Sequence, residues 1–195
     1  MARDRESAGS QPGMPAEHAL LALLDQRDDG ASHGYELAKQ FDEGQPLGNI
    51  IRLEAGMIYH HLKKLERLGW VSSSSVKGER TARRTVQLTE RGREELRLWL
   101  AAPVAHTREI RLEFLVKLYF ALQIDAAQAS RLVSEQRQAC LRFREVLLAE
   151  DDSVEPDDTT NGPTQFSLLV REMRIAQTDA ALTWLDRVGR GEPRE

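Results

Sequence analysis

The segment from His33 to Gly92 restricts the fold most, because two helical stretches are followed there by two β-prone stretches that flank a basic turn. In the second helical stretch, GMIYHHLKKLERLG, the residues Ile58, Leu62 and Leu65 fall on one face of a helical wheel with about 100° per residue. Its last residue, Gly69, is typical of a helix C-terminus. The order helix, helix, hairpin predicts a winged helix, which is a helix-turn-helix with a β-ribbon attached.

The other face of this helix is small, aromatic and cationic. It carries Gly56, Tyr59, His60, Lys63 and Arg67, with Lys64 beside them. Further cations follow in the turn and second strand of the hairpin: Lys77, Arg80, Arg83 and Arg84. A winged helix typically places its second helix in the DNA major groove, so we predict that these residues contact DNA, with the hairpin on the backbone or in the adjacent minor groove. Because side chains alternate along a strand, we expect only one of Arg83 and Arg84 to reach DNA well.

Each of these helix residues also has an ordinary structural interpretation. Lys63 and Arg67 could form a solvated helix face, and Tyr59 could pack against the first helix. Gly56 could let main-chain N–H groups approach a phosphate, or it could mark a tight junction between loop and helix. The basic hairpin beside the helix favours DNA binding over a merely solvated face.

Charge is unevenly distributed along the chain. The 195 residues carry a formal net charge of −4. Residues 52–93 contain ten Lys and Arg against four Glu, a net charge of +6, so the remainder carries −10. A basic face on an acidic protein can hold phosphates while the remainder repels nonspecific contacts.

Apolar spacing and turn residues predict the other elements of the N-terminal part. Residues 1–14 are charged and rich in Gly and Pro, and we expect them to form a flexible tail. The predicted elements that follow are a helix at 15–28, a second helix from a Ser32 cap to Phe41, a loop at 44–49, the recognition helix at 54–68, strands at 70–74 and 83–88, and a helix capped by Thr89 and broken by Pro103.

The C-terminal part is predicted to be helical at 108–122, 126–149 and 164–188, with an acidic loop at 150–162. Two series with seven-residue spacing predict a seam that packs against a partner helix: Leu132, Ala139, Val146 and Val133, Cys140, Leu147. The expected fold class is therefore mainly α. A winged-helix domain with a two-stranded β-wing occupies residues 15–103, and a helical dimerisation and effector domain occupies residues 104–195.

Several stretches, in this order, resemble the PadR family of bacterial transcriptional regulators. They are HGYEL at 33–37, GMIY at 56–59, the residues Leu62, Lys63, Leu65, Glu66 and Gly69, the pair Arg83-Arg84, and LTERG at 88–92. In the C-terminal half, LYFA at 118–121 and EQR at 135–137 resemble the longer subfamily with a virulence-activator-like C-terminal domain. The resemblance covers roughly residues 17–188 and implies a homodimeric, usually repressing, promoter-binding protein that a small aromatic or drug-like ligand sometimes releases.

Two departures from the family pattern concern the DNA-facing residues. The family often has Tyr near the end of the second wing strand, where this chain has Thr85-Val86, and commonly has Pro directly after the recognition-helix Tyr, where this chain has His60. Both departures affect the sequence preference more than the ability to bind DNA.

Three aromatic residues in the C-terminal half, Trp99, Phe114 and Trp184, could line a pocket for a small aromatic effector. Aromatic residues at helical spacing more often form a core or a dimer interface, so both interpretations stay open. Cys140 lies in the predicted seam, which favours a packed small residue over a redox sensor.

Other classes of function find little support in the sequence. Neighbouring helical residues such as His60 and His61 diverge by about 100°, which disfavours joint metal binding even with His33 nearby, and we expect His33 to cap or pack at the start of its helix. The single cysteine excludes an internal disulfide framework. The sequence shows no phosphate-binding glycine loop, nucleophile elbow or spaced His/Glu motif, so we predict no enzyme, no metal and no cofactor.

The expected compartment is the cytoplasm, with no membrane association, because no apolar run approaches the roughly 20 residues of a membrane span and the N-terminal residues lack an apolar signal region. The predicted function is a sequence-specific regulator, a homodimeric repressor on double-stranded promoter DNA that a small-molecule ligand relieves. Two other functions remain open: a winged helix used for protein–protein contact, and a small-molecule sensor without operator binding.

Overall fold

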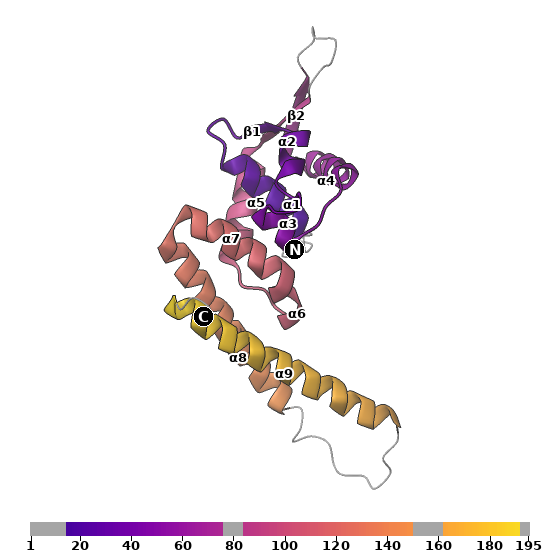
Figure 1. The fold of residues 1–195 in the computed structure, drawn as a ribbon, viewed down its shortest axis with the longest axis vertical. Helices are drawn as coiled ribbons and strands as arrows, with labels where there is room; N and C mark the ends of the chain where they lie inside the picture. Colours follow the sequence, from indigo (N-terminus) through magenta and orange to yellow (C-terminus); the bar gives the residue numbers. More distant parts are fainter. Residues whose placement is uncertain (1–14, 76–83, 150–161, 192–195) are drawn as a thin grey trace, which may run out of the picture. The chain divides into compact units, whose positions relative to one another are not determined.

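The computed structural model describes residues 15–75, 84–149 and 162–191, which form two compact units divided between Leu96 and Arg97 (Figure 1). The predicted fold class, mainly α with a small β-wing, is confirmed. The predicted tail at 1–14, the turn Lys77–Arg80 and nearly all of the acidic loop at 150–162 lie outside the described residues.

The N-terminal unit combines short helices with a small sheet. Its helices are α1 (Pro15–Asp25), α2 (Gly34–Lys39), α3 (Pro46–Ile50) and α4 (Ala55–Leu68), and α5 (Glu90–Ala101) begins in this unit. The strands β1 (Ala31–His33), β2 (Val71–Ser75) and β3 (Arg84–Leu88) form an antiparallel sheet in the order β1-β3-β2. The β2–β3 pair is the predicted wing, with Val71 opposite Leu88 and Ser75 opposite Arg84.

Two local predictions in this unit were wrong. Ser32 belongs to strand β1, opposite Val86, and the N-cap position of α2 is His33. A three-residue strand has almost no signal of its own, since it forms through pairing with β3, more than 50 residues later in the chain. The predicted loop at 44–49 contains the short helix α3, which Pro46 opens and the buried Leu47 anchors.

The recognition helix is held by its apolar face, as predicted. Ile58, Leu62 and Leu65 are buried, and Gly69 ends the helix in the left-handed conformation with φ 73°. Thr89 caps α5 as predicted, because its Oγ1 accepts a hydrogen bond of 3.1 Å from the Gly92 N–H.

The C-terminal unit is helical. It contains α6 (Thr107–Glu109), the π-helical turn η1 (Ile110–Phe114), α7 (Leu115–Ile124), α8 (Ala126–Ala149) and α9 (Gly162–Arg190). The π turn interrupts the helix predicted at 108–122, because the spacing of apolar residues does not reveal a change in backbone hydrogen bonding.

Helices α8 and α9 lie side by side and run antiparallel (Figure 1). Two ion pairs join them along their length, Arg137 Nε to Asp186 Oδ1 at 2.5 Å and Arg144 Nε to Asp179 Oδ1 at 2.6 Å. One of the predicted series on α8 is buried throughout: Val133, Cys140 and Leu147. The other series ends on the exposed Val146.

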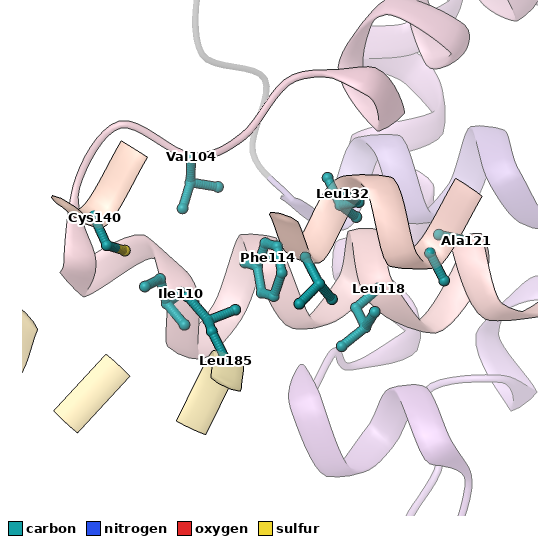
Figure 2. Close-up of a cluster of buried hydrophobic side chains, with 10 residues drawn as sticks. Val104, Ile110, Phe114, Leu118, Ala121, Leu132, Cys140 and Leu185 are labelled. Atoms are coloured by element: carbon teal, nitrogen blue, oxygen red, sulfur yellow. The ribbon is translucent and has the colours of Figure 1, made fainter. Parts of the chain in front are cut away.

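Figure 2 shows the core of the C-terminal unit, where side chains from the segment before α6, from η1, and from α7, α8 and α9 point toward one another. Phe114 is fully buried, and its ring centroid lies 6.0 Å from that of Trp184. Cys140 lies in this core, and burial raises the pKa of its thiol. Both findings favour the packed interpretation of Cys140 over a redox sensor.

Candidate nucleic-acid interface

The outer face of α4 presents the predicted small, aromatic and cationic residues to solvent. Gly56, Tyr59, His60, Lys63 and Arg67 are all exposed. The Arg67 Nε donates a hydrogen bond of 3.4 Å to the Lys63 carbonyl oxygen, which lays this side chain along the helix. Because the opposite face of α4 is packed in the core, the helix cannot easily rotate. The exposed side chains are therefore held in a defined orientation, which suits a binding surface.

Tyr59 is both packed and exposed. Its side chain is 55% exposed, yet a Cβ added at Gly34 would lie only 2.6 Å from the Tyr59 Cε1. The tyrosine ring therefore lies directly against the first residue of α2, and a side chain at residue 34 would displace it. The packing partner is α2, whereas the sequence interpretation named the first helix.

Gly56 stands in open space near the start of α4. A Cβ added there would have no heavy atom within 4 Å. A tight junction between loop and helix is therefore not the reason for glycine at this position.

An ion pair joins the recognition helix to the wing. Arg84 Nη2 lies 2.5 Å from Glu66 Oε2. The pKa of the Glu66 carboxyl is lowered, chiefly by the Arg84 guanidinium and to a smaller extent by a hydrogen bond from Ser73. Glu66 is the single carboxylate on this side of α4, and Arg84 of the sheet neutralises it. Beside it lies a hollow of about 200 Å³, lined by residues that include Tyr59, Lys63 and Arg84.

Lys64 points away from this face and is engaged elsewhere. Its Nζ lies 2.7 Å from Oε1 and 2.9 Å from Oε2 of Glu17 on α1. The His61 Nδ1 lies 3.3 Å from the same carboxylate. Glu17 is 1% exposed, so a buried charge on α1 holds α4 through two of its residues.

From the sequence, we considered His61 only for metal binding and did not consider Glu17. The one signal is the pair Glu17 and His18 inside the otherwise apolar stretch AEHALLALL. Nothing local indicates that the partner of Glu17 is 47 residues away.

Of the predicted wing residues, Arg84 lies in the described part of the chain, exposed at the start of β3. Lys77, Arg80 and Arg83 lie outside the described residues. Among the described residues, no group of three or more His, Cys, Asp or Glu side chains is placed to hold a metal ion.

The three aromatic residues considered for a ligand site have partners within the C-terminal unit. The Trp99 Nε1 donates a hydrogen bond of 2.9 Å to Glu113 Oε1, and the Lys117 Nζ lies 4.9 Å from the centre of the Trp99 ring. Burial lowers the pKa of Lys117. Phe114 and Trp184 pack against each other. The three rings therefore do not line one open cleft together. A ligand site built from them stays a prediction.

In the described part of the chain, no helix combines the length and the apolar character that crossing a bilayer requires.

The chain is similar to known transcriptional regulators along most of its length. A protein of Mycobacterium tuberculosis named "Probable transcriptional regulator Rv1176c" is 28% identical over 189 residues, covering 90% of this chain and 96% of the relative. The "Negative transcriptional regulator PadR" of Bacillus subtilis is 29% identical over 123 residues, covering 63% of this chain and 65% of the relative. The crystal structure of Bacillus subtilis PadR in complex with operator DNA is 25% identical, with a TM-score of 0.42, covering 88% of this chain and 96% of that one.

Two family models match consecutive parts of the chain. The model described as "Transcriptional regulator PadR-like family" matches residues 20–98, and the model described as "Virulence activator alpha C-term" matches residues 110–190. The chain therefore belongs to the PadR-like family of transcriptional regulators, with a C-terminal domain of the virulence activator alpha type.

Proposed function

We propose that this regulator binds double-stranded promoter DNA as a homodimer and represses transcription, with α4 in the major groove and the β2–β3 hairpin on the flanking backbone. The observation that carries the proposal is the exposed cationic face of α4 on a helix whose opposite face is buried. Repression is supported by the Bacillus subtilis relative, which is named a negative transcriptional regulator.

Lys63, Arg67 and Arg84 are the proposed cationic contacts among the described residues, and Tyr59 is proposed to contact the backbone or a base edge. His60 and Gly56 lie on the same face and complete the proposed contact surface. Lys64 has a weaker claim than the sequence suggested, since its ammonium is held by Glu17. Lys77, Arg80 and Arg83 remain proposed wing contacts on sequence grounds alone.

The test is a fluorescence anisotropy titration with the promoter DNA upstream of the protein's own gene, against scrambled DNA, over a series of salt concentrations. We expect tight, selective binding with a steep negative slope of log affinity against log salt. Lys63→Ala or Arg67→Ala is expected to weaken binding by about tenfold and to reduce the slope by about 1. Arg142→Ala is the matched control, because Arg142 is an exposed arginine on α8, outside the proposed interface.

Equal and weak binding to both DNAs, unchanged in the Lys63 and Arg67 variants, would contradict the proposal. That result would favour a winged helix that contacts another protein or a ligand sensor without an operator.

For the homodimer we propose the exposed apolar stripe on the first half of α9. Phe166, Leu169 and Met173 lie within one stripe at helical spacing, and each is more than half exposed. An exposed stripe of large apolar side chains is typical of an interface, and a second copy of the chain would present the same stripe in return. Two copies would also supply two recognition helices for two half-sites.

Met173→Glu is expected to shift the dimer toward monomer by at least about tenfold in dissociation constant, because it places a charge in an apolar interface. Sedimentation equilibrium measures this shift, and Met173→Leu, which keeps an apolar side chain of similar volume, is the control. A wild-type chain that sediments as a monomer, or a Met173→Glu variant that dimerises as well as wild type, would disprove the assigned interface.

We also propose that a small organic ligand relieves repression. Such a ligand acts only if its affinities for the DNA-binding and the released conformations differ.

A further inference from the structure

Glu66 is a negatively charged residue on a surface whose proposed contacts Lys63, Arg67 and Arg84 are cations. It lies in the last turn of α4, three residues after Lys63, and lines the same hollow as Lys63 and Arg84. A carboxylate repels the phosphates of any nucleic acid, so an unpaired one at this position would oppose the proposed function. The role of Glu66 therefore depends on the groups that it contacts.

Both strands of the wing hold the Glu66 carboxylate. Arg84 Nη2 on β3 lies 2.5 Å from Glu66 Oε2, and the Ser73 hydroxyl on β2 donates a hydrogen bond to the same carboxyl group. The Arg84 main chain is held as well, because its carbonyl oxygen lies 3.4 Å from Nδ1 of His33, the N-cap residue of α2. The guanidinium is therefore oriented by a charge-assisted hydrogen bond between the recognition helix and the wing.

Fold stability does not account for this ion pair. The Arg84 side chain is 60% exposed and the Glu66 side chain is 34% exposed. Ion pairs as exposed as this one contribute little to the free energy of folding. The pair has a larger effect on the charge of the surface, because it cancels a cation that would otherwise be available to phosphates. Affinity for non-operator DNA depends mainly on the number of phosphates that a protein neutralises, so this affinity is the property that the pair controls.

We propose that Glu66 is a specificity-determining residue, because it holds the Arg84 guanidinium in one orientation and keeps it from neutralising the phosphates of non-operator DNA. The inference rests on the proposed function, since it takes α4 and the β2–β3 hairpin as the DNA-binding surface. On the operator, an oriented guanidinium makes its contact with little further loss of side-chain freedom. Other DNA offers no such contact, and the paired charge is not available to it. Glu66 is thus a positioning residue that acts through Arg84.

The test compares Glu66→Gln with the wild-type chain by fluorescence anisotropy on promoter and scrambled DNA over a series of salt concentrations. The amide keeps the size of the side chain and an acceptor oxygen, so the substitution removes only the charge. We expect binding to scrambled DNA to tighten by about fivefold, with a slope of log affinity against log salt that is steeper by about 0.9, because one more cation meets a phosphate. Promoter affinity is expected to change by less than about twofold, because the freed guanidinium gains charge but loses its orientation. Selectivity for the promoter therefore falls.

Glu145→Gln is the matched control, because it makes the same change in net charge at an exposed residue of α8 in the C-terminal unit. We expect it to leave the affinity for both DNAs unchanged. A second comparison repeats Glu66→Gln in an Arg84→Ala background, where it is expected to leave selectivity unchanged because no guanidinium remains to be held. An equal loss of selectivity in that background would mean that Glu66 acts on DNA directly, which overturns the proposal. Thermal unfolding temperatures show that each variant is folded.

Elution from immobilised heparin tests the same role without an operator. Heparin is a polyanion without base edges, so its affinity for the protein reports the available positive charge. We expect Glu66→Gln to elute at a higher salt concentration than Glu145→Gln, and we expect this difference to vanish when Arg84→Ala is added to both variants. Equal elution of the two single variants, or unchanged selectivity of Glu66→Gln on DNA, overturns the inference. A wild-type chain that binds promoter and scrambled DNA equally would instead contradict the proposed function, and the heparin comparison would still decide whether Glu66 restrains Arg84.

Discussion

Replacing Gly92 with alanine is expected to lower the free energy of unfolding of the N-terminal unit by about 3 kcal/mol. A Cβ at residue 92 would lie 2.1 Å from the Trp70 carbonyl oxygen and 2.9 Å from Leu88 Cδ1. The carbonyl cannot easily move, because it accepts a hydrogen bond of 3.1 Å from the Thr89 N–H. The start of α5 must therefore separate from the backbone at the start of β2, which disturbs the cap of α5 and the wing together.

Hydrogen exchange of the α4 and β3 amide groups measures this change within the N-terminal unit. The matched control is Gly56→Ala, in which the new methyl group meets no atom within 4 Å on a helical residue. We expect this control to gain about 0.4–1 kcal/mol, because alanine loses less conformational entropy than glycine when a helix forms. Equal effects of the two substitutions would show that the close approach at Gly92 does not limit stability.

Gly56→Ala also separates two roles for the same residue. If backbone N–H groups near the start of α4 approach a phosphate closely, the added methyl group weakens DNA binding while it stabilises the fold. Unchanged DNA affinity would remove Gly56 from the proposed contact surface.

The elements that the sequence predicts well are those with their own periodic signal. Helix α4 and helix α8 begin and end within a residue of their predicted bounds, since apolar spacing and terminating residues such as Gly69 are local. Val86 and Leu88 are buried on alternate positions of β3, as the alternation indicated.

The elements that the sequence missed leave no local signal of their own. Strand β1 exists through its pairing with β3, and the π turn at Ile110–Phe114 keeps the apolar spacing of a helix. The same limit applies to the site. A helical wheel shows which residues share the outer face of α4, but the position of Lys64 follows from Glu17 on another helix.

Lys64→Met is expected to lower the free energy of unfolding of the N-terminal unit by about 3 kcal/mol, because it leaves the Glu17 carboxylate in the protein interior without its cation. Glu17 is 1% exposed, whereas the Lys64 side chain is 38% exposed. The effect is therefore placed at the lower end of what breaking a buried ion pair costs. His61 remains near the carboxylate, with its Nδ1 at 3.3 Å.

A double-mutant cycle distinguishes a stranded charge from a simple loss of packing. Glu17→Gln alone is expected to cost about 1 kcal/mol, since Lys64 can turn into solvent and the amide oxygen still faces His61. Adding Glu17→Gln to Lys64→Met should then restore stability to within about 1 kcal/mol of the Glu17→Gln variant, because no buried carboxylate is left without a cation. If the two losses instead add, the carboxylate is not the source of the penalty.

The neighbouring lysine gives the functional half of this prediction. Lys63 and Lys64 are adjacent in the sequence, but Lys63 stands on the exposed face of α4 and Lys64 reaches back to α1. Lys63→Ala is therefore expected to weaken promoter binding with little change in stability, and Lys64→Met is expected to lower stability while the folded protein keeps its DNA affinity within about threefold. Chemical denaturation measures the stability of both variants, and fluorescence anisotropy measures their DNA affinity. A Lys64→Met variant that is fully stable but loses DNA binding would return Lys64 to the proposed interface and contradict the anchoring role of Glu17.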